Sequence, residues 1–173
     1  MITQRTLFGA GAGLCVTLFA TALYFQHVMG LEPCPLCIFQ RVFVIGLGVV
    51  MIAGLVHNPG AFWRKCYGGI VVLFGVLGIS VAGRHVWLQH LPEDQVPECG
   101  PGLDYMLEAF PLGETLQMVF TGSGECAEVQ WTLFGLSIPA WTLLIFVGLT
   151  VFGFFMLLSS RDLRGGVFGR KPA

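Results

Sequence analysis

The chain has 173 residues, of which 55% are hydrophobic and 11% charged, and its net charge is −1. A soluble domain carries about 25% charged residues, so this composition excludes an ordinary water-soluble globular domain. The mean hydropathy of +0.78 indicates more apolar side chain than one small core can absorb, which favours segments that cross a membrane.

Four segments have the length and composition of membrane-spanning helices, at residues 7–26, 38–56, 67–87 and 136–158. Helices are expected rather than strands because the open edges of a sheet cannot be satisfied in lipid. The sequence therefore predicts an all-α integral membrane protein, a four-helix transmembrane bundle that forms a single domain.

The first segment could instead be a cleaved signal peptide, since Arg5 precedes it and Ala20-Thr21-Ala22 has the spacing of a cleavage site. However, the apolar run continues to Phe25, which makes it long enough to span a bilayer. Three further spans need no secretion signal to explain them. We therefore favour a membrane-spanning helix, and cleavage would leave the rest of the topology unchanged.

The loop at residues 27–37 carries a C-x-x-C motif, Cys34-Pro35-Leu36-Cys37. Such a motif serves redox chemistry, zinc binding and structural crosslinks alike, so its setting has to decide. Proline on both sides of Cys34 and an apolar run from Ile38 place Cys37 in the first turn of the second helix. The partial positive charge of a helix N-terminus favours a thiolate there.

Arg41 follows Cys37 by four residues and is expected on the same helical face, about one turn deeper. It could simply anchor the helix at the membrane interface. Its spacing from the cysteine favours a functional role, because the guanidinium would be a second cationic neighbour of a thiolate. A thiolate stabilised in this way is a good leaving group in disulfide exchange and a good electron donor.

The loop at residues 57–66 contains the turn signal Asn58-Pro59-Gly60, which makes the second and third helices antiparallel neighbours. Two groups of polar and aromatic residues lie at the outer ends of the first and third helices, and they could hold the ring carbonyl of a bound electron acceptor: Phe25-Gln26-His27 and Arg84-His85-Val86-Trp87-Leu88-Gln89-His90. Interfacial anchoring explains most such residues. Among the histidines, we expect His90 and His85, ahead of His27, to touch an acceptor.

Residues 88–135 form the long loop, whose prolines and glycines leave room only for short helices or strands. One candidate is Leu116 to Phe120, either a short helix at the membrane surface or part of a local loop core. The loop also holds Cys99 and Cys126, which group naturally as a second pair.

The charges give the orientation of the bundle. Seven of the nine Lys and Arg residues fall on one side, which is therefore cytoplasmic: Arg5, Arg64, Lys65, Arg161, Arg164, Arg170 and Lys171. Both termini are expected there, and the two cysteine-bearing loops are expected on the opposite, oxidising side. Of the two remaining cysteines, Cys15 is expected to be a buried apolar residue and Cys66 an ordinary thiol.

A disulfide that oxidises another protein becomes a dithiol, so an electron acceptor is needed to reoxidise it. The chain has no iron–sulfur or haem signature. A mobile acceptor dissolved in the bilayer would meet Cys37 where the second helix enters the membrane. From this position we hypothesise a quinone.

Two ordered blocks of the sequence resemble the DsbB family of disulfide bond formation proteins. The first is Tyr24-Phe25-Gln26-His27-Val28-Met29, ahead of Pro33-Cys34-Pro35-Leu36-Cys37-Ile38-Phe39-Gln40-Arg41. The second is Ser123-Gly124-Glu125-Cys126-Ala127-Glu128-Val129-Gln130-Trp131, then Gly135-Leu136 and Pro139-Ala140-Trp141. The resemblance covers essentially the whole chain and is far more specific than a lone C-x-x-C. Between Leu91 and Thr115 only the general position of Cys99 is comparable.

The resemblance implies a multi-pass protein of the bacterial inner membrane with its active site on the periplasmic side. Its partner would be a periplasmic DsbA-like thioredoxin-fold protein, and its cofactor a quinone, either ubiquinone or menaquinone. No nucleic acid and no resident metal are expected. The activity would be that of a quinone-dependent protein-dithiol oxidoreductase that sustains disulfide bond formation in periplasmic proteins.

Carried over residue by residue, the resemblance implies that Cys99 forms the mixed disulfide with reduced DsbA and that Cys126 is its partner. Cys126 then exchanges with Cys34, which leaves Cys37 as the thiolate facing the quinone, assisted by Arg41. His90 matches a family histidine near the quinone.

Three other classes of protein remain alternatives. A metal-binding or metal-transport protein would use the four outer cysteines as a thiolate site. A structural tetraspan protein would use its disulfides only to brace the loops. A relative of the quinone-linked vitamin K epoxide reductases would also have a C-x-x-C in a helix bundle, but the second sequence block does not favour it.

Overall fold

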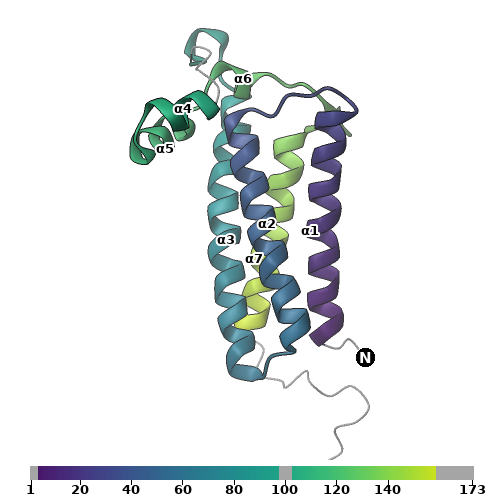
Figure 1. Ribbon diagram of the computed structural model, residues 1–173. Coiled ribbons are helices and arrows are strands. Elements are labelled where there is room, and N and C mark those ends of the chain that lie inside the picture. Colours follow the sequence, from purple (N-terminus) through teal and green to yellow (C-terminus); the bar gives the residue numbers. More distant parts are fainter. Residues whose placement is uncertain (1–3, 98–102, 159–173) are drawn as a thin grey trace, which may run out of the picture.

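The computed structural model describes residues 4–97 and 103–158. Its four long helices lie side by side in a bundle (Figure 1), and they are α1 (Gln4–His27), α2 (Pro35–His57), α3 (Ala61–Leu88) and α7 (Ile138–Leu158). Each of them is long and apolar enough to cross a membrane. The predicted all-α fold with four membrane-spanning helices is therefore confirmed.

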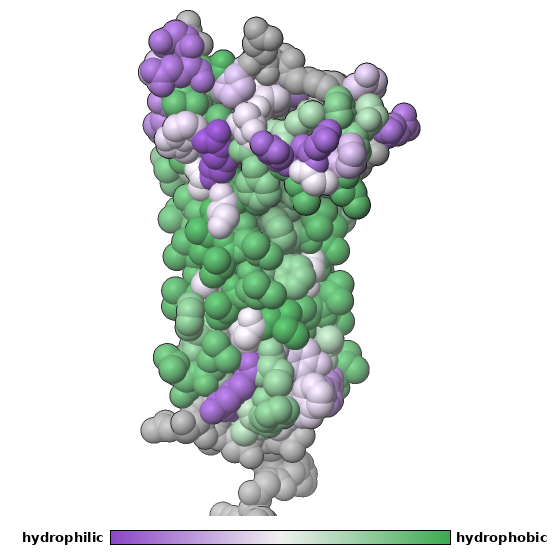
Figure 2. All heavy atoms as spheres, turned by 90° about the vertical axis from the view of Figure 1, so that its left-hand side faces the viewer, coloured by the Kyte–Doolittle hydropathy of each residue, from purple (hydrophilic) through white to green (hydrophobic). Residues whose placement is uncertain are grey.

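The surface of the bundle is apolar along its middle. Figure 2 shows hydrophobic residues over the central part of one face, with hydrophilic residues gathered towards both ends. Large apolar side chains such as Val49, Leu73 and Val151 point outward from three of the helices. Exposure of this kind is unfavourable in water and favourable against lipid tails, so the chain is a multi-pass membrane protein.

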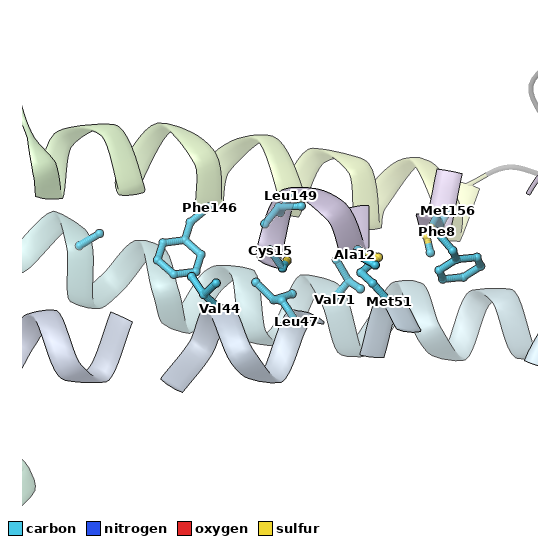
Figure 3. Close-up of a cluster of buried hydrophobic side chains, with 11 residues drawn as sticks. Phe8, Ala12, Cys15, Val44, Leu47, Met51, Val71, Phe146, Leu149 and Met156 are labelled. Carbon is cyan, nitrogen blue, oxygen red and sulfur yellow. The ribbon is translucent and has the colours of Figure 1, made fainter. Parts of the chain in front are cut away.

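The interior of the bundle is a continuous apolar core to which all four long helices contribute. Its buried residues are spread along the bundle (Figure 3) and include Phe8 and Cys15 of α1, Leu47 of α2, Val71 of α3 and Phe146 of α7. Cys15 is buried in this core, where a free thiol behaves as a small apolar side chain.

Helices α3 and α7 approach closely because glycines on α3 face bulky residues on α7. A Cβ atom at Gly75 would collide with the hydroxyl of Thr150, and one at Gly78 would collide with the ring of Phe146. Small residues at such positions are the usual means by which membrane helices pack in the absence of a hydrophobic driving force.

The helix ends differ from those expected from hydropathy. Helix α2 begins three residues earlier than expected, at Pro35, and α3 begins at Ala61, so that Arg64 lies buried in its first turns. At α3, hydropathy marks only the apolar part of the helix, whereas the backbone hydrogen bonds continue through the charged residues Arg64 and Lys65. Leu136 and Ser137 form a strand instead of the start of the fourth helix.

That strand belongs to a small hairpin, in which β1 (Thr132–Leu133) pairs antiparallel with β2 (Leu136–Ser137). The two turn residues, Phe134 and Gly135, both have positive φ, of 52° and 78°. Two consecutive positive φ angles are typical of the tight turn that matches the twist of a two-residue hairpin. The turn therefore delays the start of α7 to Ile138.

The remaining short elements lie at one end of the bundle, which we call the loop end (Figure 1). They are η1 (Glu93–Gln95), α4 (Leu103–Ala109), α5 (Leu112–Thr121) and α6 (Gly124–Ala127). The predicted short piece, Leu116 to Phe120, lies within α5. Its Val119 is buried in a local core, while Leu116 and Phe120 are exposed.

Arg84 of α3 fixes the end of α5. Its guanidinium donates hydrogen bonds to the carbonyl oxygens of Phe120 (3.0 Å) and Thr121 (2.9 Å) and stacks on the ring of Trp87. These carbonyls lie in the last turn of a helix, where they lack partners of their own. The chain that leads from α5 into α6 therefore starts from a fixed point on α3.

Candidate functional site

The C-x-x-C motif forms the start of α2. Cys34 is the residue before the helix, and Pro35 occupies its first position. A proline there needs no partner for a backbone N–H, and its fixed φ suits the helix, so α2 begins at the motif rather than at the apolar run. Cys37 consequently lies in the first turn, where the sequence places it. Leu36 and Cys34 are buried, whereas Cys37 is partly exposed.

His85 of α3 lies against both cysteines of this motif. Its Nε2 is 3.7 Å from the Sγ of Cys34, and its Nδ1 is 3.9 Å from the Sγ of Cys37. The histidine is only 2% exposed. Because an imidazole nitrogen donates or accepts according to its protonation, one ring bridging two sulfurs can exchange a proton with either of them.

A chain of hydrogen bonds continues from His85 to α7. The side-chain amide of Gln40 donates to Nδ1 of His85 at 3.2 Å, and the hydroxyl of Thr142 donates to Oε1 of Gln40 at 2.7 Å. An amide NH2 group can only donate, so in this orientation Nδ1 accepts and the imidazole proton is on Nε2, facing Cys34.

Sequence reasoning did not assign Gln40 or Thr142 to the site. Gln40 had a usable signal, since it is a polar residue within an apolar helix and lies three positions after Cys37. Thr142 had no such signal, because a threonine in a membrane helix commonly bonds to its own backbone. The carbonyl oxygen of Pro139 also lies 2.9 Å from this hydroxyl, so the single hydroxyl proton is shared between it and Oε1 of Gln40.

Cys126 approaches the motif from the long loop. It lies in the single turn of α6, is completely buried (0% exposed) and shares a local apolar core with Cys34. A hydrogen bond with Cys34, together with burial, raises the pKa of the Cys126 thiol well above its ordinary value. Cys126 is therefore a protonated thiol at neutral pH, in contact with Cys34.

The structure thus brings together three of the four cysteines that the sequence singles out, Cys34, Cys37 and Cys126. All five described cysteines are free thiols, so no disulfide is present among them. Cys99 lies outside the described residues. The three clustered sulfurs form a continuous path from the loop to the start of α2.

Arg41 lies one turn beyond Cys37 and ties α2 to the end of α1. Its Nη1 donates to Oε1 of Gln26, and its Nη2 donates to the carbonyl oxygen of Ala22 at 3.1 Å. These contacts hold the guanidinium on the same side of α2 as Cys37, and both residues line one cavity.

This cavity has a volume of about 300 Å³ and lies among α1, α2, α7 and the hairpin segment. Its walls are mainly apolar and include the rings of Phe25 and Trp131, whose centroids are 4.9 Å apart. Its few polar side chains include Gln40, Arg41 and Thr142. Apolar walls with a few fixed polar groups are characteristic of a binding site for a small molecule.

A smaller cavity, of about 40 Å³, borders the motif as well. It is lined by Cys34, Cys37 and His85, and by three acidic side chains, Glu32, Glu125 and Glu128. Cys37 therefore lies between a large apolar cavity and a small acidic one.

The histidines occupy different places. His85 lines only the small cavity, although it contacts Cys37, which borders the large one. His90 is exposed, its Nδ1 lies 2.8 Å from the carbonyl oxygen of Val86, and it lines neither cavity. Contact of either histidine with an electron acceptor stays a prediction.

The chain matches a family of known proteins. A family model described as "Disulfide bond formation protein DsbB" matches residues 4–156. A protein of Saccharophagus degradans named "Disulfide bond formation protein B" is 56% identical over 135 residues, 78% of this chain and 81% of the relative. A protein of Nitrosococcus oceani with the same name is 53% identical over 150 residues, 87% and 89% of the two chains. "Disulfide bond formation protein B 1" of Pseudomonas aeruginosa is 46% identical over 147 residues, 85% and 90% of the two chains.

These matches span most of both chains, at identities well above the level at which a family is shared. They agree with the four membrane helices and with the cluster of cysteines at the loop end. The chain belongs to the DsbB family, whose members are membrane oxidoreductases of disulfide bond formation.

Proposed function

We propose that the protein reoxidises a periplasmic DsbA-like thioredoxin-fold protein and passes the electrons to a membrane quinone. In the overall reaction, a protein dithiol and a quinone become a protein disulfide and a quinol, so that two electrons and two protons are transferred. The observation that carries this proposal is the cavity of about 300 Å³ that Cys37 and Arg41 line together.

The lining of this cavity fits a quinone head group, which is a flat ring with two carbonyl oxygens. The rings of Phe25 and Trp131 can pack against such a ring. Arg41 has five N–H donors, so its contacts with Gln26 and Ala22 leave others for a carbonyl oxygen. The lining extends to Leu18, Val44 and Ile145, within membrane-spanning helices, which suits a ligand that arrives from the bilayer. A bound quinone would supply the two-electron acceptor.

The contact between Cys126 and Cys34 supports a relay of disulfide exchanges. The family resemblance implies that a thiolate of the partner attacks Cys99, which breaks the Cys99–Cys126 bond and releases Cys126 as a thiolate. Cys126 then attacks Cys34, forming a Cys34–Cys126 bond and releasing Cys37 as a thiolate. The positive end of α2 and the guanidinium of Arg41 stabilise this leaving group.

The remaining steps complete the cycle, and they need no oxidant besides the quinone. The second thiolate of the partner attacks its own mixed disulfide, which releases oxidised partner and a Cys99 thiolate. Cys99 attacks Cys126 and restores their bond, which frees Cys34. A bound quinone would accept the two electrons that are given up when the sulfurs of Cys34 and Cys37 bond to each other, and the Cys34–Cys37 disulfide would be restored. His85, in contact with both sulfurs, is placed to carry their protons.

The distribution of charge supports a periplasmic site in the inner membrane, with both termini in the cytoplasm. Arg64 and Lys65 lie at the end of the bundle opposite the site. The acidic residues Glu32, Glu125 and Glu128 lie at the loop end, around the cysteines. Cytoplasmic ends of membrane helices carry the excess of Lys and Arg.

Oxidation of a reduced DsbA-like protein by the purified full-length chain tests the proposal, with ubiquinone and menaquinone compared. We expect thiols to be lost from the partner as quinol forms, in equal two-electron amounts. Cys37→Ser and Cys99→Ser should each abolish the reaction without preventing membrane insertion, and Cys66→Ser should have no effect. No stimulation by either quinone would contradict the proposal, and full activity in both site variants would support the structural alternative.

A further inference from the structure

Three side chains of the site have the chemistry and the arrangement of metal ligands. One ligand atom each from Cys34, Cys37 and His85 lies within 4.8 Å of the other two. In a tetrahedral zinc site, with bonds of about 2.0–2.3 Å, neighbouring ligand atoms are roughly 3.3–3.8 Å apart. Nε2 of His85 lies 3.7 Å from the sulfur of Cys34, within this range. The sulfur of Cys37 lies 3.9 Å from the other ring nitrogen, Nδ1, so a small rotation of the imidazole or of Cys37 would bring both sulfurs around one nitrogen.

The small cavity provides room and charge for a cation. Its volume of about 40 Å³ is comparable with the roughly 30 Å³ that one water molecule occupies in the liquid. All three ligand residues line it, and so do Glu32, Glu125 and Glu128. Carboxylates around a cavity raise the local concentration of cations, and one carboxylate or a water molecule can serve as the fourth ligand.

His85 is also held as a ligating histidine usually is. In metal sites, the ring nitrogen that does not bind the ion is commonly hydrogen-bonded to a neighbouring group. Nε2 of His85 is the nitrogen near Cys34, while Nδ1 lies beside the side-chain amide of Gln40. Binding through Nε2 requires the imidazole proton to move to Nδ1. The side-chain amide of Gln40 then turns over, so that its oxygen accepts from Nδ1 and its NH2 group donates to the hydroxyl of Thr142, which still donates to the carbonyl oxygen of Pro139.

We propose that Cys34, Cys37 and His85 form a redox-gated site for a soft divalent cation of the zinc class. The dithiol form binds the ion, because two thiols exchange their protons for it and become thiolates, with no electron transferred. The oxidised form does not bind it, because the two sulfurs are then bonded to each other. A bound ion occupies both sulfurs that the relay uses and therefore inhibits turnover. The inhibition rests on the proposed function, whereas the binding does not.

The test uses the purified full-length chain in its reduced and oxidised forms, without quinone or partner protein. Zn²⁺ is titrated against a chromophoric chelator, and Co²⁺ serves as a spectroscopic probe. We expect one Zn²⁺ per reduced chain, none after oxidation, and a thiolate-to-cobalt charge-transfer band. His85→Gln should weaken binding by at least about tenfold, and Cys37→Ser should weaken it further. His57→Gln and Cys66→Ser remove the same kinds of group at the opposite end of the bundle and should change nothing.

Several results would overturn the proposal: equal binding by both redox forms, unchanged affinity in His85→Gln, or a cobalt spectrum without a sulfur band. A site lost in Cys99→Ser but kept in His85→Gln would be a four-thiolate site and would overturn it too. The cobalt spectrum of the unsubstituted protein, in its reduced and oxidised forms, tests redox-dependent thiolate binding even if a variant fails to fold. If zinc does not bind but quinone-dependent oxidation is intact, only this inference is contradicted. If zinc binds but quinone-dependent oxidation is absent, only the proposed function is contradicted.

Discussion

The hydroxyl of Thr142 in α7 donates a 2.7 Å hydrogen bond to Oε1 of Gln40 in α2. Gln40 in turn donates to Nδ1 of His85, so a hydroxyl on the last helix orients the ring that touches both sulfurs of the motif. Gln40 is buried, and a buried polar group that loses its partner costs about 1–3 kcal/mol. This network therefore favours one orientation of the imidazole.

Thr142→Val tests the network, because it replaces the hydroxyl with a methyl group of similar size. We expect dithiol oxidation to slow by about three- to tenfold, since the orienting bond is worth roughly 1 kcal/mol. Thr17→Val is the matched control, because the Thr17 hydroxyl bonds only to its own helix, at an exposed position. Turnover numbers with saturating partner and quinone provide the measurement. Equal rates in wild type and Thr142→Val would mean that His85 does not depend on this bond.

Arg41→Lys keeps the positive charge but removes the planar group that reaches Gln26 and Ala22 together. We expect the KM for quinone to rise by about tenfold, because lysine cannot reproduce the fixed fork of donors. The KM for the partner protein should not change, because the proposed relay begins at Cys99 in the long loop. Steady-state rates over a range of quinone concentrations separate the two constants. A fall in kcat at constant KM for quinone would instead mean that Arg41 acts mainly by stabilising the Cys37 thiolate.

The pH dependence of Cys126 alkylation tests its raised pKa. A higher pKa means less thiolate at a given pH, and the ordinary value for a cysteine here is 9.0. In the reduced folded protein, the alkylation rate of Cys126 should therefore keep rising above pH 9, whereas in denatured protein it should level off there. Mass spectrometry of peptides from both samples gives the two rates. Burial alone would slow the folded reaction by a constant factor, with the same levelling near pH 9.

The same shift predicts a direction for stability. Folding raises the pKa of Cys126, so the stabilisation that comes from its protonated form is complete below about pH 9 and is lost as the pH rises further. The reduced protein should consequently melt at a lower temperature in strong alkali. In the Cys126→Ala variant, the melting temperature should fall less steeply above pH 9 than in the unsubstituted protein.

Gly75→Ala tests the close contact between α3 and α7. The added methyl group would collide with Thr150, and overpacking of this kind costs about 1–3 kcal/mol. Gly69→Ala is the matched control on the same helix, since beyond the neighbouring helix backbone no described atom lies within 4 Å of the methyl group there. Thermal melting in detergent should show a lower midpoint for Gly75→Ala only. Equal midpoints in the two variants would mean that α3 and α7 can separate without cost.

The sequence alone predicted the four helices, the membrane and the place of Cys37 in the first turn of α2. Lipid leaves a spanning backbone few alternatives, so 20 or so apolar residues identify a helix directly. The helical period of 3.6 residues then predicts that Arg41 lies on the same face of α2 as Cys37. In the structure, both side chains line the same cavity. Hydropathy did not predict where α3 and α7 begin. Charged residues lie inside the first turns of α3, and a hairpin of apolar residues precedes α7.

Tertiary structure decided how the motif is surrounded. Cys126 reaches Cys34 because Arg84 fixes the end of α5, and His85 reaches both sulfurs because α3 packs against α2. No local pattern encodes these contacts, since each joins residues far apart in the chain. The free energy of a contact between distant segments is set by how whole helices pack, whereas spans and helical faces follow from neighbouring residues alone. Composition and spacing therefore determined which sulfur chemistry the chain carries, and packing decided which residues surround it.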